Sequence, residues 1–242
     1  MTVHTRWYSH RLGRDVQVVR YGHYGAPVLH FPTAGHDAYE AERHGLVHAL
    51  GPLLGAGRVK LYSCDSVAGQ VWTDGHSSGA HRGWMQNQFD AFVAHELVPA
   101  VRADCHSPDI ELIATGASFG AFNAVASLCR HPDLFRVAIA MSGTYDLSPW
   151  LHGEHSFDFH VSSPLHFLPD LHDHDHLARL RRRFVVLALG QGRWEDPGES
   201  WRMADVLGSR GVPNRVDMWG YQYDHDWPTW REMLPLYLDT YT

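Results

Sequence analysis

The sequence predicts an α/β protein with a mostly parallel central sheet, helices on both faces of that sheet and no large cap domain. Two observations carry this prediction. Short apolar runs of strand type alternate with segments of helical spacing along the 242-residue chain, and such alternation is typical of parallel sheets with crossover helices. Hydrophobic residues make up 44% of the chain, which shows no repeat, linker or low-complexity segment. We therefore expect one globular domain over residues 1–242.

The individual elements follow from local patterns. Runs of apolar and β-branched residues bounded by turn residues predict strands at residues 16–21, 26–34, 58–64, 110–115, 136–143, 183–190 and 214–221. Apolar residues recurring at spacings of three and four predict helices at residues 39–50, 83–104, 119–129, 177–183, 199–209 and 227–241. In an open parallel sheet the functional site lies at the carboxyl ends of the strands.

Charge and cysteine content bear on partners and compartment. The formal net charge is −7 and no basic face is evident, so we expect neither nucleic acid nor a membrane as a partner. Cys64, Cys105 and Cys129 cannot all pair and match no metal motif, which indicates free thiols in a reducing cytosol. The polar N-terminus does not resemble a signal peptide, and no apolar run is long enough to span a bilayer. We therefore expect a soluble, cytoplasmic protein.

A candidate nucleophile lies in the segment Gly116-Ala117-Ser118-Phe119-Gly120. This is the pattern G-x-S-x-G, placed between a predicted strand and a predicted helix. In that context it is typical of a nucleophile elbow, a strained turn that projects the serine hydroxyl above the sheet. Glycine is needed on both sides because a Cβ would collide in so tight a turn. The alternative is a strand–helix turn that contains a serine by chance.

The base and the acid are sought by their order along the chain, which in this architecture is serine, acid, histidine. Among the 20 histidines, His225 is the one between the last predicted strand and the last predicted helix. The acid should follow the strand at residues 183–190, where Glu195 and Asp196 are adjacent. Both cannot face the histidine from one extended loop, and their spacing does not decide between them.

Two backbone N–H groups are expected to form an oxyanion hole. One is that of Phe119, the residue after the nucleophile, and the other comes from the loop after the strand at residues 26–34. Pro32 has no N–H group, which leaves Thr33 or Ala34 as the donor. The alternative is that this segment is only a turn, as its composition also explains.

A histidine-rich tract offers a second chemical possibility. His172, His174 and His176 alternate with Asp173 and Asp175, and such a pattern can bind a divalent metal. The simpler interpretation is a solvated loop whose acids lie near the start of a helix, where the dipole favours them. We expect no metal at Ser118 and no cofactor.

Several segments together resemble the “putative esterase” family of α/β-hydrolases, which includes S-formylglutathione hydrolases of the esterase D type and mycobacterial mycolyltransferases. They are FPTAGHDAYE, TGASFGAFNAV, IAMSGTYDL, GQGRWED and WGYQYDHDWPTWREMLPLYL. The resemblance implies Ser118 as nucleophile and His225 as base, favours Glu195 as the acid, and implies the N–H of Thr33 in the oxyanion hole. Asp224 is a departure, because better-known relatives have glycine there. The segment VAGQVWTDGHSSGAH and the histidine tract also depart, so the substrate cannot be carried over.

These features together predict a serine esterase that cleaves a small-molecule carboxylic ester or thioester through an acyl-enzyme on Ser118. Two alternatives remain at this point. The same triad could pass the acyl group to another acceptor, as an acyltransferase does, or the chain could be a non-catalytic protein of hydrolase fold that binds a ligand or partner. The sequence leaves open the acyl group, the leaving group and the oligomeric state.

Overall fold

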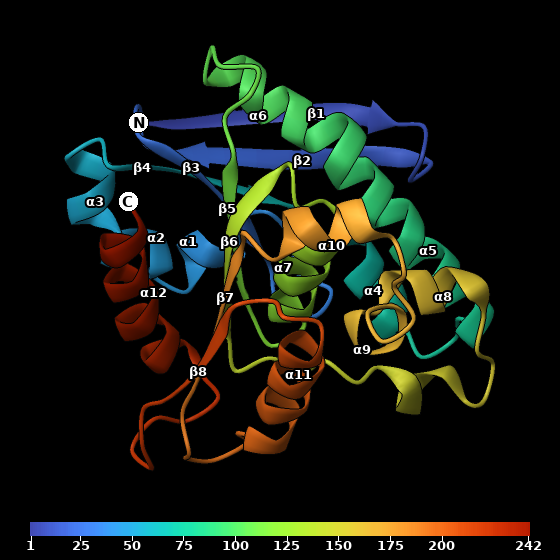
Figure 1. Ribbon diagram of the computed structural model, residues 1–242. Helices are drawn as coiled ribbons and strands as arrows, with labels where there is room; N and C mark the ends of the chain where they lie inside the picture. Colours follow the sequence, from blue (N-terminus) through green and yellow to red (C-terminus); the bar gives the residue numbers. More distant parts are fainter.

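The computed structural model describes all 242 residues and contains one eight-stranded sheet with the strand order β1-β2-β4-β3-β5-β6-β7-β8 (Figure 1). The strands are β1 Thr2–Ser9, β2 Arg14–Tyr21, β3 Ala26–Phe31, β4 Val59–Cys64, β5 Leu112–Ala117, β6 Phe135–Met141, β7 Phe184–Leu189 and β8 Asn214–Met218. From β4 to β8 every neighbouring pair is parallel, whereas β1 and β2 pair antiparallel at one edge. The prediction of a mostly parallel α/β sheet is confirmed.

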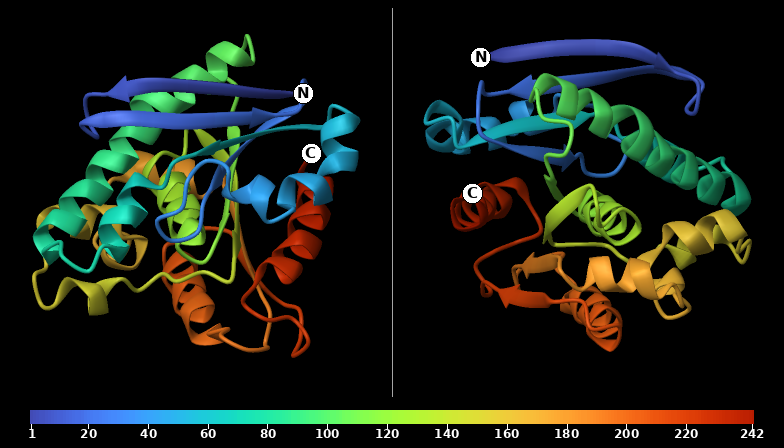
Figure 2. Two further views of the ribbon diagram at one scale, coloured as in Figure 1. Left: turned by 180° about the vertical axis from the view of Figure 1, so that it is seen from behind. Right: turned by 45° about the horizontal axis from the view of Figure 1, so that its top comes forward.

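Helices cover both faces of the sheet (Figure 2). One core cluster lies between the sheet and the face formed by α1 Glu40–Arg43, α2 Leu46–Ala49, α3 Gly51–Gly55 and α12 Trp227–Tyr241. The larger cluster lies on the opposite face, which is formed by α4 Val67–Thr73, α5 Gly79–Phe92, the π-helical turn η1 Val93–Leu97, α6 Val98–Asp104, α7 Phe119–Arg130, the 3₁₀ turn η2 Ser148–Leu151, α8 Phe157–Ser162, α9 Pro164–Phe167, α10 His174–Leu180 and α11 Pro197–Ser209. None of these helices combines the length and apolar character needed to cross a membrane.

The central strands explain why the sequence pattern works. All residues of β5 are buried, and so is nearly all of β7. A strand covered on both faces can therefore be read as a continuous apolar run. The edge strand β1 is exposed along most of its length and carries polar residues. It has no apolar run to read, and it was absent from the sequence-based prediction.

Three predicted helices differ from the structure by three residues or more, and the one expected at residues 177–183 is α10 His174–Leu180. The helix expected at residues 39–50 is broken into α1 and α2, and Gly45 between them has a φ of +75°. The helix expected at residues 83–104 begins earlier, at Gly79, because the Ser78 hydroxyl accepts a hydrogen bond from the N–H of His81. That helix also widens into a π-helical turn at Val93–Leu97. The short helices α3, α4, α8 and α9 and the turn η2 were not predicted.

The carboxyl ends of the parallel strands bring five loops to one edge of the sheet. The loop after β3 carries Thr33, β5 leads into Ser118, β6 ends just before Ser142, β7 is followed by Glu195 and β8 by His225. These segments are far apart along the chain. Because parallel strands end at a common edge, the fold places all five loops together.

Candidate active site

Ser118 occupies a strained turn between β5 and α7. Its φ and ψ are +55° and −121°, a conformation that residues other than glycine rarely adopt. A Cβ added at Gly116 would collide with the backbone of Gly120, and one added at Gly120 would collide with the carbonyl oxygen of Phe31. Both glycines are therefore required by backbone contacts. The turn has the geometry expected of a nucleophile elbow.

His225 and Glu195 lie side by side at the same edge of the sheet. The Nδ1 atom of His225 is 3.7 Å from Oε2 of Glu195, which is longer than a hydrogen bond. The His225 side chain is 22% exposed, whereas that of Glu195 is 1% exposed. The imidazole is thus partly open to the surface, whereas the carboxylate is buried.

The other carboxylate oxygen of Glu195 is held firmly. Oε1 accepts hydrogen bonds from the hydroxyl of Ser142 at 2.6 Å and from the backbone N–H of Gly190 at 3.0 Å. Two donors occupy the acceptor sites of this oxygen. The oxygen that remains to interact with the imidazole is Oε2.

Asp196 and Asp224 face other partners. The Asp196 side chain caps the start of α11 by accepting the N–H of Gly198 at 2.9 Å. The structure therefore places Glu195, and not Asp196, beside His225. Asp224 pairs with Arg193, whose Nη2 is 2.8 Å away. Hydrogen bonds from the backbone N–H and side chain of Arg193 hold the pKa of Asp224 below its ordinary value.

The assignment of Thr33 to the oxyanion hole requires correction. The N–H of Thr33 donates to Oε2 of the buried Glu40 at 2.7 Å, so it is already used. The next residue, Ala34, lines the same cavity as Ser118 and Phe119, and its N–H has no partner within the loop. The N–H of Phe119 opens α7 and has no partner within that helix. These two N–H groups are the available donors beside Ser118.

Glu40 holds the loop that carries Ala34. Besides the N–H of Thr33, its carboxylate accepts the Thr33 hydroxyl at 2.6 Å and lies 2.8 Å from Nδ1 of His36. Burial raises the pKa of the Glu40 carboxyl, although the hydrogen bonds from Thr33 act against that shift. On the other side of the loop, the Ser66 hydroxyl donates to the carbonyl oxygen of Ala34 at 2.6 Å. Sequence analysis missed Glu40, because no local pattern distinguishes a buried glutamate from an exposed one.

Two adjoining hollows open around these residues. The first has a volume of about 160 Å³ and is mostly apolar, with lining residues Ala34, Trp72, Thr73, Ser118, Phe119, Thr144, Leu147 and Trp150. The second has a volume of about 350 Å³ and is more polar, with lining residues Ser142, Gly143, Thr144, Asp146, Pro149, Trp150, Trp194, Asp196, Glu199, Arg202 and His225. Thr144 and Trp150 belong to both. Ser118 therefore opens into an apolar hollow and His225 into a polar one, and the two hollows share two lining residues.

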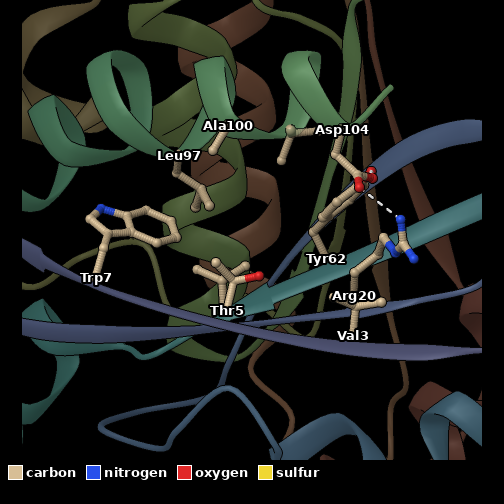
Figure 3. A pocket seen from close by; sticks show the side chains of 10 residues that line it. Val3, Thr5, Trp7, Arg20, Tyr62, Leu97, Ala100 and Asp104 are labelled. Carbon is tan, nitrogen blue, oxygen red and sulfur yellow. Dashed lines mark hydrogen bonds and ion pairs between the residues drawn. The ribbon is translucent and has the colours of Figure 1, made fainter. Parts of the chain in front are cut away.

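A third hollow lies elsewhere, between the antiparallel strands at the sheet edge and α6 (Figure 3). Its volume is about 100 Å³. At one end Asp104 pairs with Arg20 at 2.7 Å and accepts the Tyr62 hydroxyl at 2.6 Å. These polar groups already bind each other, and the lining contains neither serine nor histidine. This hollow is not the candidate active site.

The histidine tract forms no convergent ligand set. Asp173 caps α10 by accepting the N–H of His176 at 2.9 Å, and the ring of His176 lies 2.7 Å from the carbonyl oxygen of Cys129. His172 and His174 are exposed. No group of three or more histidine, cysteine, aspartate or glutamate side chains is arranged to hold a metal ion.

A profile of a protein family described as “Putative esterase” matches residues 65–239, well over half of the chain. The chain belongs to this esterase family. The family places the protein among the ester-hydrolysing enzymes, as the resemblance implied. A search among curated proteins found no match.

Several solved structures share the fold of this esterase-family chain. A ferulic acid esterase has 15% identity and a TM-score of 0.71, covering 99% of this chain and 97% of its own. An S-formylglutathione hydrolase from Agrobacterium tumefaciens has 13% identity and a TM-score of 0.68, covering 100% and 92%. MPT51 from Mycobacterium tuberculosis has 19% identity and a TM-score of 0.67, covering 99% and 97%. These similarities confirm the α/β-hydrolase fold.

Proposed function

We propose that this esterase-family protein hydrolyses a small carboxylic ester or thioester through an acyl-enzyme on Ser118, with His225 as base and Glu195 as its acid partner. The observation that carries the proposal is the position of these residues. A serine in the strained elbow and a histidine backed by a buried carboxylate open into two hollows that share Thr144 and Trp150 in their walls. Serine is a weak nucleophile by itself and needs such a base beside it.

The proton of Ser118 is transferred to His225, and Glu195 orients the imidazole that accepts it. The carboxylate of Glu195 faces Nδ1 of His225 and favours the tautomer that carries its proton there, which leaves Nε2 free to accept the proton of Ser118. The separation of 3.7 Å between Nδ1 and Oε2 is long for a hydrogen bond. Such contacts are often long without substrate and shorten in the reacting complex.

Charge that develops on the substrate is stabilised by the backbone. When Ser118 Oγ bonds to the carbonyl carbon, the carbonyl oxygen becomes an oxyanion. The N–H groups of Ala34 and Phe119 supply two donors for it, and they need little reorganisation because each is held by the fold. His225 then gives its proton to the leaving oxygen or sulfur, and the acyl group remains on Ser118. Water activated by His225 releases the acid in the second half of the reaction.

The two hollows suggest how the substrate is divided. The leaving group receives its proton from His225, so it must lie on the side of the imidazole, in the polar hollow of about 350 Å³. The acyl group lies on the side of Ala34 and Phe119, in the apolar hollow of about 160 Å³. That volume suits a short acyl chain. The ferulic acid esterase that shares the fold is named for the acid part of its ester, and the S-formylglutathione hydrolase is named for a thioester.

Replacing the nucleophile tests the proposal. We expect Ser118→Ala to lower kcat for p-nitrophenyl acetate by roughly 10⁴–10⁶-fold, because only binding and the oxyanion donors remain. Labelling by a fluorophosphonate should be lost as well. Ser209→Ala, which removes an exposed serine hydroxyl from α11, is the control and should keep both signals. A folded Ser118→Ala protein that hydrolyses esters as fast as the parent would disprove the proposed function.

A further inference from the structure

Behind Glu195 lies a chain of hydrogen bonds formed by two buried side chains that the triad does not include. The indole N–H of Trp230 donates to Oγ of Ser142 at 2.9 Å, and that hydroxyl donates to Oε1 of Glu195 at 2.6 Å. Ser142 is 3% exposed and Trp230 is 4% exposed. Both side chains are thus almost wholly buried.

The direction of this chain follows from the groups that form it. An indole N–H can only donate, and a hydroxyl has a single proton. Because Ser142 accepts from Trp230, its own proton is free to point at Glu195. Together with the N–H of Gly190 at 3.0 Å, this proton occupies the acceptor sites of Oε1. The arrangement keeps Oε2 as the oxygen that faces His225.

Trp230 also touches the base directly. Its ring centroid lies 5.3 Å from that of His225, with the two ring planes at 79°, the edge-to-face geometry that aromatic rings prefer. The indole also packs against Trp227, with the two ring centroids 5.1 Å apart. One side chain therefore sets a wall for the imidazole and, through Ser142, orients the carboxylate behind it.

The backbone at Ser142 supports a functional interpretation. Its φ is +46°, which is unfavourable for serine, and its N–H donates to the carbonyl oxygen of Ala188 at 2.7 Å. Glycine would adopt this conformation without strain. A strained serine whose hydroxyl bonds to the carboxylate of Glu195 fits the general tendency of strain to collect at functional sites.

We propose that Ser142 and Trp230 are positioning residues of the esterase, acting through Glu195 and His225. The inference rests on the proposed function, since it assigns a role within that triad. Neither side chain needs to contact substrate. Their joint effect is to hold Oε2 of Glu195 toward Nδ1 of His225, so that the base has the correct tautomer when Ser118 attacks. Removing them should therefore lower kcat and leave KM nearly unchanged.

Variants at Ser142 test the hydroxyl separately from protein stability. Ser142→Gly relieves the positive φ while removing the hydroxyl, and Ser142→Ala removes the hydroxyl alone. Both should lower kcat for p-nitrophenyl acetate by roughly 10–100-fold with KM within about twofold, because a hydrogen bond to a charged group is lost. The urea midpoint of Ser142→Gly should be equal to or above that of Ser142→Ala. A merely structural role would instead make activity follow the urea midpoint.

Trp230→Phe keeps a ring against His225 but removes the indole N–H. We expect kcat to fall by about three- to tenfold. The double variant Ser142→Ala/Trp230→Phe should have a kcat within about twofold of that of Ser142→Ala alone, because the effects of linked groups are not additive. Trp219→Phe is the matched control. This change removes a different indole hydrogen bond to α12, which Trp219 donates to the Tyr237 hydroxyl at 2.8 Å. It should leave kcat unchanged.

The outcomes separate the two proposals. Ser118→Ala is measured in the same assay. If Ser118→Ala is inactive and both Ser142 variants and Trp230→Phe keep the parent kcat, the positioning role is wrong and the proposed function stands. Strictly additive losses of kcat in the double variant would also overturn the positioning role. So would a rise in KM with kcat unchanged. If Ser118→Ala is fully active, the proposed function fails and the positioning role fails with it.

Discussion

Glu195 and Glu40 are two buried carboxylates with nearly the same set of partners, and they serve different parts of the candidate site. Each accepts a backbone N–H and a hydroxyl, and each lies near Nδ1 of a histidine. For Glu195 the donors are Gly190 and Ser142, at 3.0 and 2.6 Å. For Glu40 both come from Thr33, at 2.7 and 2.6 Å.

The difference between the two regions lies in what each carboxylate holds. The histidine beside Glu40 is His36, whose side chain is 52% exposed and whose Nδ1 lies 2.8 Å from Oε1 of Glu40. His36 lines neither hollow of the site. His225 beside Glu195 lines the polar hollow, which shares Thr144 and Trp150 with the hollow at Ser118. Glu40 thus fixes a stretch of backbone, and Glu195 faces a side chain that can move a proton. A buried acid–histidine pair is therefore no sign of a triad until its place relative to a nucleophile is known.

The largest expected effect is at Glu195. Glu195→Gln should depress kcat by about 10³–10⁴-fold with little change in KM, because the amide no longer stabilises the imidazolium or selects its tautomer. Steady-state kinetics with p-nitrophenyl acetate measure both constants. A loss in kcat of less than about tenfold would mean that Glu195, like Glu40, only holds the structure and takes no part in the triad.

Glu40→Ala should have a smaller and mixed effect. It leaves the N–H of Thr33 buried without a partner, which should lower the free energy of unfolding by about 1–3 kcal/mol. The adjacent Ala34 N–H is then held less firmly, so kcat should fall by about 10–100-fold. Complete removal of one oxyanion donor can cost more, up to about 10³-fold in kcat. Glu42→Ala on the same helix, where the exposed side chain accepts from Tyr21, is the control. Unchanged kcat in Glu40→Ala would show that this loop does not serve catalysis.

Acidification probes the strand that leads into the Glu40 region. His30 in β3 is fully buried, and neither ring nitrogen has a hydrogen-bond partner. Burial lowers the pKa of His30 from 6.5 to about 4. The unfolded chain therefore binds a proton at higher pH than the folded protein does, and stability falls as the pH drops from 6.5 to about 4.

The size of this effect is about 3 kcal/mol at 1.36 kcal/mol per pKa unit. Urea unfolding between pH 7 and pH 4 should show it as a difference between the parent and His30→Leu, whose stability should depend less on pH by that amount. Parallel curves for the two proteins would mean that His30 is not held neutral by burial.

The smallest expected effect concerns Asp196, the neighbour of Glu195. Asp196→Asn keeps a side chain that caps helices well, so the free energy of unfolding should change by only a few tenths of a kcal/mol. With its oxygen on the N–H of Gly198, it has no part in orienting His225, and kcat should be unchanged. A loss of kcat as large as that of Glu195→Gln would mean that the two acids share the role.

Much of the fold could be predicted because the central strands and α12 carry strong local signals. The helix expected at residues 227–241 agrees with α12 Trp227–Tyr241, whose start is marked by Asp226 and a following proline. The elements that escaped prediction are short or lie at the edge. Strand β1 is half solvated, and α8 and α9 span only six and four residues, too few to show a helical period.

The sequence by itself determined the elbow around Ser118 and the place of His225, because both depend on local turn chemistry and on the order of strands and helices. Tertiary structure decided the rest. It turned Glu195 rather than Asp196 toward the histidine, and it gave the Thr33 N–H to Glu40 and left that of Ala34 open. It also joined Trp230 to Ser142 across 88 positions and Ser142 to Glu195 across 53. Hydrogen bonds between residues so distant leave no local pattern, since they depend on where the loops meet once the sheet has formed.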